Sequence, residues 1–217
     1  MLDIALYMIV FFLVWTIEVF VLIPFGPQIS SPFLAQLWSD ALRLAIWVLP
    51  VFWYLRRFAG VKDRFAALKM RTVGKNLRLW IPAAIGFAAL LFALQALAAG
   101  APRPNLPADA RGWLLLVLRL PIAPLAAEIL FRGFVLGVLQ RQQPFWMANV
   151  STAILFTAAN WPEWVVFFGQ DFVLNASPGV FVFGLFLGYL REKTDSLWPG
   201  VGLHILNNLL AALIAFG

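Results

Sequence analysis

Long apolar stretches alternate with short polar, glycine- or proline-containing segments along the whole chain. A helix needs about 20 residues to cross the hydrocarbon core of a bilayer, and most of these stretches approach or exceed that length. Seven segments are expected to span a membrane: 4–25, 36–55, 80–99, 112–140, 144–161, 178–191 and 197–216. The pattern therefore predicts an all-α fold, a polytopic integral membrane helical bundle of about seven transmembrane helices, with residues 1–217 forming a single transmembrane domain.

Prolines and glycines add local detail to this pattern. Pro121 and Pro124 should kink or break the fourth segment, because each removes a helix hydrogen bond. A broken helix at membrane depth is tolerated only against protein or water, so the bundle is expected to enclose an intramembrane polar cavity at this point. Gly184 and Gly188 predict a close helix-packing face. Residues 162–177, which include several aromatic side chains, are expected to form an outer loop in the membrane interface.

The composition supports a membrane protein, since 63% of the residues are hydrophobic and 12% are charged, against about 25% charged in soluble domains. Half of the 16 Lys and Arg residues lie in one loop, residues 56–78. Membrane topology explains the net charge of +6, and no nucleic-acid partner is predicted. The positive-inside rule places this loop and the N-terminus in the cytoplasm, as in a protein of the plasma (bacterial inner) membrane. Residues 61–70 are expected to form a short surface helix on anionic headgroups of the lipid bilayer.

Ionisable residues within the apolar segments are the most informative polar positions. Each costs roughly 2.5–3.5 kcal/mol at the centre of a bilayer. Glu128 and Arg132 are four residues apart, so they share one helix face and can form an ion pair. That face should point toward protein or trapped water. Glu18 and Arg43 are expected to pair in a structural role, with Arg119 as the competing partner.

Three of the predicted spans carry polar or aromatic residues at a spacing of four, which places each pair on one helix face. The pairs are Glu128 and Arg132, Phe156 and Asn160, and His204 and Asn208. The chain has no cysteine and a single histidine, so thiol chemistry is excluded and neither a metal site nor a cofactor is predicted. The settings of serine and paired-aspartate proteases are also absent. What remains is a carboxylate that activates water, with His and Asn side chains that hydrogen-bond a developing oxyanion.

In this order the three pairs resemble the motifs of the CAAX-processing and bacteriocin-processing (CPBP) family of glutamic intramembrane endopeptidases. That family carries Glu-Glu-x-x-x-Arg, then Phe-x-x-x-His, then His-x-x-x-Asn or Asp on successive spans, and the match covers about residues 112–212. The resemblance implies hydrolysis of a peptide bond in a membrane-protein or lipid-anchored precursor, with no cofactor. It also implies that His204 and Asn208 stabilise the oxyanion, while Glu128 and Arg132 support the site.

Two positions depart from the family pattern. Ala127 occupies the slot of the first glutamate, which is the expected base, and Asn160 stands where the family has a histidine. Three accounts stay open: a deliberate inactivating replacement, a natural pseudoprotease that acts as a membrane scaffold or immunity-type binding protein, or Glu128 serving as the base. Residues 127 and 128 differ by about 100° around an α-helix, so the last account requires an altered helix here. The sequence shows no internal repeat, which weighs against a small-molecule permease.

Overall fold

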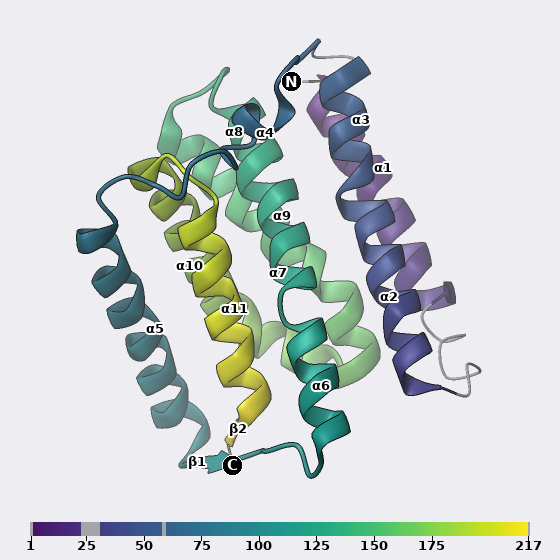
Figure 1. Cartoon of the computed structure of the whole chain (residues 1–217), viewed down its shortest axis with the longest axis vertical. Coiled ribbons are helices and arrows are strands. Elements are labelled where there is room, and N and C mark those ends of the chain that lie inside the picture. The colour runs from purple at the N-terminus through teal and green to yellow at the C-terminus, as the bar shows by residue number, and fades with distance from the viewer. Residues whose placement is uncertain (1, 23–30, 58–59, 217) are drawn as a thin grey trace.

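The computed structural model describes residues 2–22, 31–57 and 60–216, without the side chains of a few residues among them. The described chain is almost entirely helical (Figure 1), which confirms the predicted all-α fold. In chain order the elements are α1 (Leu2–Ile17), η1 (Glu18–Leu22), α2 (Pro32–Trp47), α3 (Leu49–Arg57), α4 (Arg64–Ala67), α5 (Leu77–Ala99), β1 (Pro102–Pro104), α6 (Ala110–Arg119), α7 (Ile122–Ala127), η3 (Glu128–Val135), α8 (Leu136–Leu139), α9 (Phe145–Phe168), α10 (Gln170–Thr194), α11 (Trp198–Leu213) and β2 (Ile214–Phe216). The two η elements are π-helices.

Several of these helices have the length and composition of membrane spans. Within the described residues, five stretches are long and apolar enough to cross a membrane: Asp3–Val21, Phe33–Arg57, Leu77–Leu97, Ala110–Leu139 and Gln170–Thr194. α9 and α11 run alongside them (Figure 1) but do not meet both the length and the hydropathy of a membrane span. α11 has only 16 residues, and α9 is interrupted by polar side chains such as Asn149 and Asn160. The fold is thus that of a helical membrane bundle, and the count of seven spans stays a prediction.

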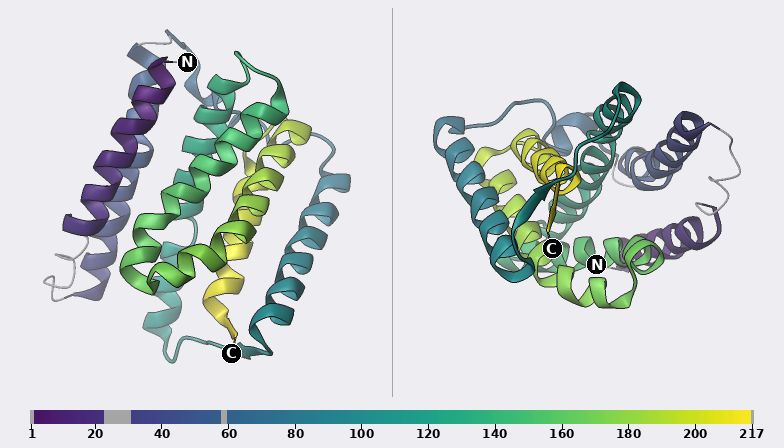
Figure 2. Two further views of the ribbon diagram at one scale, coloured as in Figure 1. Left: turned by 180° about the vertical axis from the view of Figure 1, so that it is seen from behind. Right: turned by 90° about the horizontal axis from the view of Figure 1, so that it is seen from below.

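The two ends of the bundle are built differently. The N-terminus and α4 lie at one end, whereas the C-terminus and the two short strands lie at the other (Figures 1 and 2). β1 pairs antiparallel with β2, with Arg103 opposite Ala215, so the segment expected to be helical to residue 216 leaves the helix at Leu213. The surface helix expected over 61–70 is reduced to the single turn of α4, in which the N–H of Ala66 donates to the carboxylate of Asp63.

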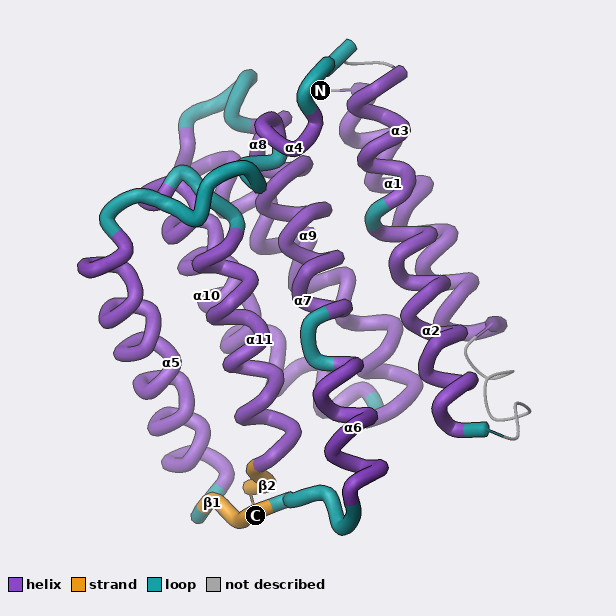
Figure 3. Tube along the Cα trace, viewed as in Figure 1, coloured by secondary structure: helices purple, strands orange, loops and turns teal. Residues whose placement is uncertain are grey.

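The segment that carries Glu128 is broken as its prolines predicted. α6 ends at Arg119 and α7 begins at Ile122, directly after Pro121, and a short non-helical stretch separates them (Figure 3). From Glu128 onward the helix widens into the π-helix η3, at whose end the N–H of Leu136 donates to the carbonyl of Phe131, five residues earlier. π-helical turns inside α-helices are rare and occur mostly at functional sites.

The prediction of an outer loop over residues 162–177 is wrong. α9 continues through Pro162 to Phe168, the chain reverses at Gly169, and α10 begins at Gln170. Gly169 has φ 86°, a conformation that favours glycine, so the turn needs a single residue. A proline is tolerated within a helix at membrane depth because neighbouring helices compensate the lost hydrogen bond, and here α9 lies directly against α10 (Figure 2).

The close-packing face predicted from Gly184 and Gly188 is confirmed. A Cβ atom added at Gly184 would lie 3.2 Å from the Cβ of Ala153, and one added at Gly188 would lie 1.8 Å from Oδ1 of Asn149. Asn149 itself is fully buried and donates from Nδ2 to the carbonyl of Leu185. α9 and α10 therefore approach each other through positions that admit no side chain on α10.

The core is centred on η3, in which every residue is buried. Phe131 packs edge-on against Trp47 and Phe156, with ring centroids 5.8 and 5.5 Å apart. Phe134 makes equivalent contacts with Tyr7 and Tyr54 at 4.9 and 5.1 Å. Side chains of α1, α2, α3 and α9 thus surround the π-helix, so its backbone hydrogen bonds lie in a shielded, apolar setting.

The expected ion pair between Glu18 and Arg43 does not form. Arg43 pairs instead with Glu163 of α9 and lies over the rings of Trp15 and Trp47. Glu18 is nonetheless buried, with 1% of its surface exposed, and it interacts electrostatically with both Arg43 and Glu163. The side chain of Arg119, the predicted competitor, lies outside what the structure describes.

Candidate functional site

The site is built on Glu128, the first residue of η3. Glu128 and Arg132 are both fully buried. Oε1 of Glu128 accepts a hydrogen bond from Nη1 of Arg132 at 3.1 Å, and Nδ1 of His204 lies 3.1 Å from the same oxygen. Arg132 also donates from Nη2 to the carbonyl of Gly184 at 3.1 Å. The cluster therefore joins three elements, η3, α10 and α11.

Phe156 of α9 shapes the apolar side of this cluster. The guanidinium carbon of Arg132 lies 4.1 Å from the centroid of the Phe156 ring, a cation–π distance. The His204 ring meets Phe156 and Phe183 edge-on, at centroid distances of 5.7 and 5.5 Å. Because these rings keep water away from the charged groups, electrostatic interactions within the cluster are stronger than they are in water.

The second carboxylate oxygen of Glu128 is the open position of the cluster. Oε2 is buried and has no hydrogen-bond partner among the described residues. It faces Gly200 of α11, where an added Cβ would lie 3.2 Å from this oxygen. A buried carboxylate oxygen without a partner is unfavourable, by roughly 1–3 kcal/mol or more for a charged group. Such an oxygen is suited to accept a hydrogen bond from a water molecule or a substrate.

Loop contacts hold the start of α11 and so fix the depth of His204. The N–H of Leu197 donates to the carbonyl of Lys69 at 3.0 Å, and Nε1 of Trp198 donates to the carbonyl of Met70 at 2.9 Å. His204 lies about two helical turns beyond Trp198. This anchoring lets the His204 ring reach the level of Glu128 and Phe156.

Within the described residues, no side-chain hydrogen bond joins the other predicted site residues to the glutamate, the arginine or the histidine of this cluster. Ala127 is buried at the end of α7 and carries no functional group. Asn160 donates from Nδ2 to the carbonyl of Phe156, within its own helix. Asn208 is half-buried one turn beyond His204, and its Oδ1 accepts a hydrogen bond from Asn207 at 3.5 Å.

Three positions of the cluster were missed by the sequence reasoning. The carbonyl of Gly184 accepts from Arg132, the backbone of Gly200 makes room for Glu128, and Phe183 packs on His204. Gly184 was expected only to pack helices, and a backbone carbonyl leaves no signal in the residue type. Gly200 follows a Trp-Pro pair, which marks a chain turn and carries no sign of a carboxylate nearby.

These features define a class of protein: a membrane-embedded helical bundle that buries a glutamate, an arginine and a histidine in hydrogen-bonding contact. Residues 109–210 match the family model described as Type II CAAX prenyl endopeptidase Rce1-like. The match agrees with the resemblance inferred from the motifs, and residues 109–210 are similar to that family. It also supports an integral membrane protein. No curated protein and no solved structure matches the chain.

Proposed function

We propose that this protein is a glutamic intramembrane endopeptidase of the CPBP type, which cleaves a membrane-anchored protein or peptide precursor with Glu128 as its base. The observation that carries the proposal is the state of the Glu128 carboxylate. One of its oxygens is held by Arg132 and His204, and the other is buried and free to bind water. A fixed carboxylate with one open oxygen has the geometry of a general base.

Glu128 lies next to the position of the missing first glutamate, at the start of the π-helix η3. In a regular α-helix, residues 127 and 128 point about 100° apart, so the second position would not replace the first. Here the helix changes its winding from Glu128 onward. Ala127 and Glu128 themselves keep α-helical φ and ψ, so Glu128 would act as the base from its own face of the helix and not from the direction of position 127.

The proposed reaction assigns one step to each side chain. A water molecule held by Oε2 of Glu128 attacks the scissile carbonyl carbon while its proton passes to the carboxylate, giving a tetrahedral oxyanion. Nδ1 of His204 lies against Glu128, and His204 and Asn208 provide hydrogen bonds to the oxyanion. Glu128 then gives its proton to the leaving nitrogen as the C–N bond breaks. Arg132 orients the carboxylate throughout.

A second candidate function is a non-catalytic pseudoprotease that acts as a membrane scaffold or immunity-type binding protein. Two observations favour it. Ala127 offers no functional group, and the side-chain amide of Asn160 is bonded to its own helix at Phe156. The two positions that hold the attacking water in the family therefore carry a methyl group and an amide that donates within its own helix.

The proposed function also requires an arrangement of the chain in the membrane. α9 and α11 would bring the number of spans to seven, around a polar cavity at Glu128, and the substrate would enter between spans. The basic residues 56–78 would face the cytoplasm and the anionic headgroups of a plasma (bacterial inner) membrane. The N-terminus would share that side, since it lies at the same end as α4 (Figure 1). The asymmetry of Lys and Arg supports this orientation.

The first test is cleavage of candidate membrane precursors in proteoliposomes by three proteins: the chain itself, Glu128→Gln and Ala127→Glu. The proposal expects cleavage by the chain and none by Glu128→Gln. Cleavage only after Ala127→Glu would show that the base belongs at position 127 and that the chain is disabled. No cleavage by any of the three, over a broad set of precursors, would favour the pseudoprotease.

A matched pair of glycines on α11 tests the open oxygen directly. In Gly200→Ala the new methyl group would lie 3.2 Å from Oε2 of Glu128 and displace the attacking water, whereas a Cβ at Gly202 meets nothing within 4 Å. Removing general-base assistance lowers rates by about 100-fold or more. We expect that loss in kcat for Gly200→Ala and an unchanged kcat for Gly202→Ala, with both variants folded by thermal denaturation. Equal rates for the two variants would contradict the assignment of Oε2.

A further inference from the structure

A polar pocket lies at the end of the bundle that carries α4. Its volume is about 650 Å³, within the range of about 300–1,000 Å³ typical of ligand sites. Its lining includes Gly133 and Phe134 of η3, the helix that begins at Glu128, and Gly137 of α8. Its walls come from α4, the end of α8 and the end of α10. The proposed peptide-bond cleavage uses none of the residues that line this pocket.

Basic side chains dominate the lining of this pocket. Five basic residues stand against two acidic ones, a balance of +3: Lys69, Lys75, Arg141, Arg191 and Lys193, with Glu192 and Asp195. Charges of one sign in a concave, partly shielded site concentrate ions of the opposite sign. The pocket is therefore electrostatically suited to an anion.

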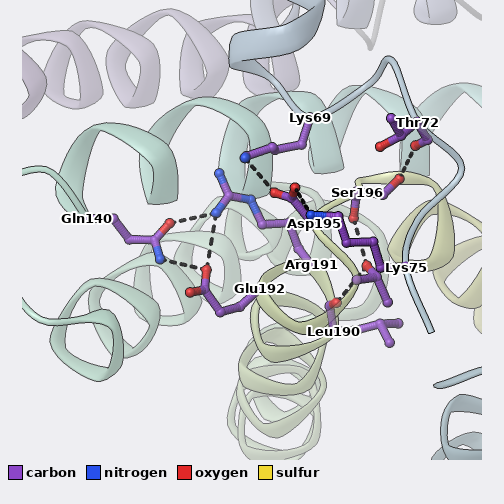
Figure 4. A network of polar contacts seen from close by, with 10 residues as sticks. Lys69, Thr72, Lys75, Gln140, Leu190, Arg191, Glu192, Asp195 and Ser196 are labelled. Carbon is purple, nitrogen blue, oxygen red and sulfur yellow. Dashed lines mark hydrogen bonds and ion pairs between the residues drawn. The ribbon is translucent and has the colours of Figure 1, made fainter. Parts of the chain in front are cut away.

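Arg191 is a buried arginine in the lining of the pocket. Only 5% of its surface is exposed. Its Nη1 donates to Oε1 of Gln140 at 2.6 Å and lies 3.5 Å from Oε2 of Glu192, which also accepts from Nε2 of Gln140 at 2.8 Å. Figure 4 shows these three side chains pointing toward one another. The Nε of Arg191 is buried and has no hydrogen-bond partner in the described part of the chain.

The two acidic residues offset only part of this positive charge: Glu192 lies beside Arg191 and Asp195 pairs with two lysines. Asp195 forms ion pairs with Lys69 at 2.5 Å and Lys75 at 3.1 Å (Figure 4). Hydrogen bonds from Lys69 and Lys75 hold the pKa of the Asp195 carboxyl below its usual value, so this carboxyl stays ionised at neutral pH. Arg141 is exposed at the rim of the pocket. An anion that entered would meet the open donors of Arg191 and the rim charge of Arg141.

We propose that this pocket binds a phosphate group, supplied by the headgroup of an anionic phospholipid or by free phosphate. A guanidinium with unused N–H donors matches the oxygen geometry of phosphate. The site lies at the end of the bundle with the basic loop, where lipid headgroups are expected. The proposal is independent of peptide cleavage, because it rests on binding at a pocket separate from Oε2 of Glu128.

The test is native mass spectrometry of the detergent-purified chain with phosphatidylglycerol, with phosphatidylcholine as the zwitterionic comparison. We expect one phosphatidylglycerol to bind at least about tenfold more tightly than phosphatidylcholine, because charge-assisted hydrogen bonds contribute at that level. Arg141→Gln and Arg191→Gln should each weaken phosphatidylglycerol binding by about tenfold. Arg103→Gln, an exposed arginine in β1 at the opposite end, is the matched control and should bind as the unchanged chain does.

Competition with inorganic phosphate identifies the source of the group. Displacement of the lipid by millimolar phosphate would support a site for phosphate from either source, and resistance to it would support a lipid headgroup site. Equal binding of the two lipids, together with no binding of phosphate, would overturn the proposal. Losses in Arg141→Gln and Arg191→Gln no larger than in Arg103→Gln would also overturn it. Arg141 is exposed, so its variant keeps the test decisive if Arg191→Gln does not fold.

Discussion

The substitution Gly188→Ala offers a sharp test of the packing that holds the site together. Gly188 lies on α10 one turn beyond Gly184, whose carbonyl binds Arg132. A Cβ at Gly188 would lie 1.8 Å from Oδ1 and 2.8 Å from Cγ of Asn149. Asn149 is fully buried and its amide is fixed by the carbonyl of Leu185, so the clash cannot be relieved by a small rotation. Either Asn149 leaves its hydrogen bond or α10 moves away from α9.

The expected loss of stability follows from three contributions. Overpacking of this severity costs about 3 kcal/mol, the upper end for an added methyl group. Loss of the hydrogen bond between Asn149 and Leu185 adds about 1 kcal/mol. The higher helix propensity of alanine offsets about 1 kcal/mol. The free energy of unfolding should therefore fall by about 3 kcal/mol, roughly a 100-fold change in the folding equilibrium constant.

The assay is unfolding by sodium dodecyl sulfate or heat in mild detergent, followed by circular dichroism. Gly179→Ala is the matched control, since it lies on the same helix and a Cβ there meets nothing within 4 Å. That variant should be as stable as the unchanged chain or slightly more so. The double substitution Gly188→Ala with Asn149→Ala removes the clashing amide and should recover most of the loss. A Gly188→Ala protein as stable as Gly179→Ala would refute the reasoning.

Two further predictions concern charged groups. Arg132→Gln leaves the buried carboxylate of Glu128 without its main partner, which should lower stability by about 3–5 kcal/mol. The double variant Arg132→Gln with Glu128→Gln removes that unpaired charge and should be more stable than Arg132→Gln alone. Thermal denaturation compares the two variants, and a double variant that is no more stable would contradict this reasoning. Asp195→Asn should lower stability at pH 7 by less than about 1 kcal/mol, since the ion pairs with Lys69 and Lys75 are partly exposed. The folded-state pKa of Asp195 is lowered, so its contribution is present above the unfolded pKa of about 4 and disappears as the pH falls through the folded value. Melting temperatures of the two proteins should therefore converge below about pH 4, and a constant difference would contradict the assignment.

Features set by neighbours within one or two helical turns were predictable from the sequence. The spacing of four between Glu128 and Arg132 predicted their ion pair, which forms at 3.1 Å. Pro121 predicted the break between α6 and α7, and Gly184 with Gly188 predicted a close-packing face, which the structure places against α9. In each case the cause is local: helical geometry places the two side chains together, a missing N–H interrupts the helix, or a missing side chain admits a neighbour.

Which residues meet across the bundle was decided by the tertiary structure. His204 lies against Glu128 across 76 positions of sequence, and Arg43 pairs with Glu163 in preference to Glu18. Asn160 shares the helical spacing of the motif, yet its amide bonds to its own backbone. A hydrophobic period shows which face of a helix is apolar, but the rotation and depth at which helices dock depend on close packing among side chains from distant segments. The π-helix at Glu128 and the anchoring of α11 set that rotation and depth here, and the sequence by itself determined only the helices and the local pairs.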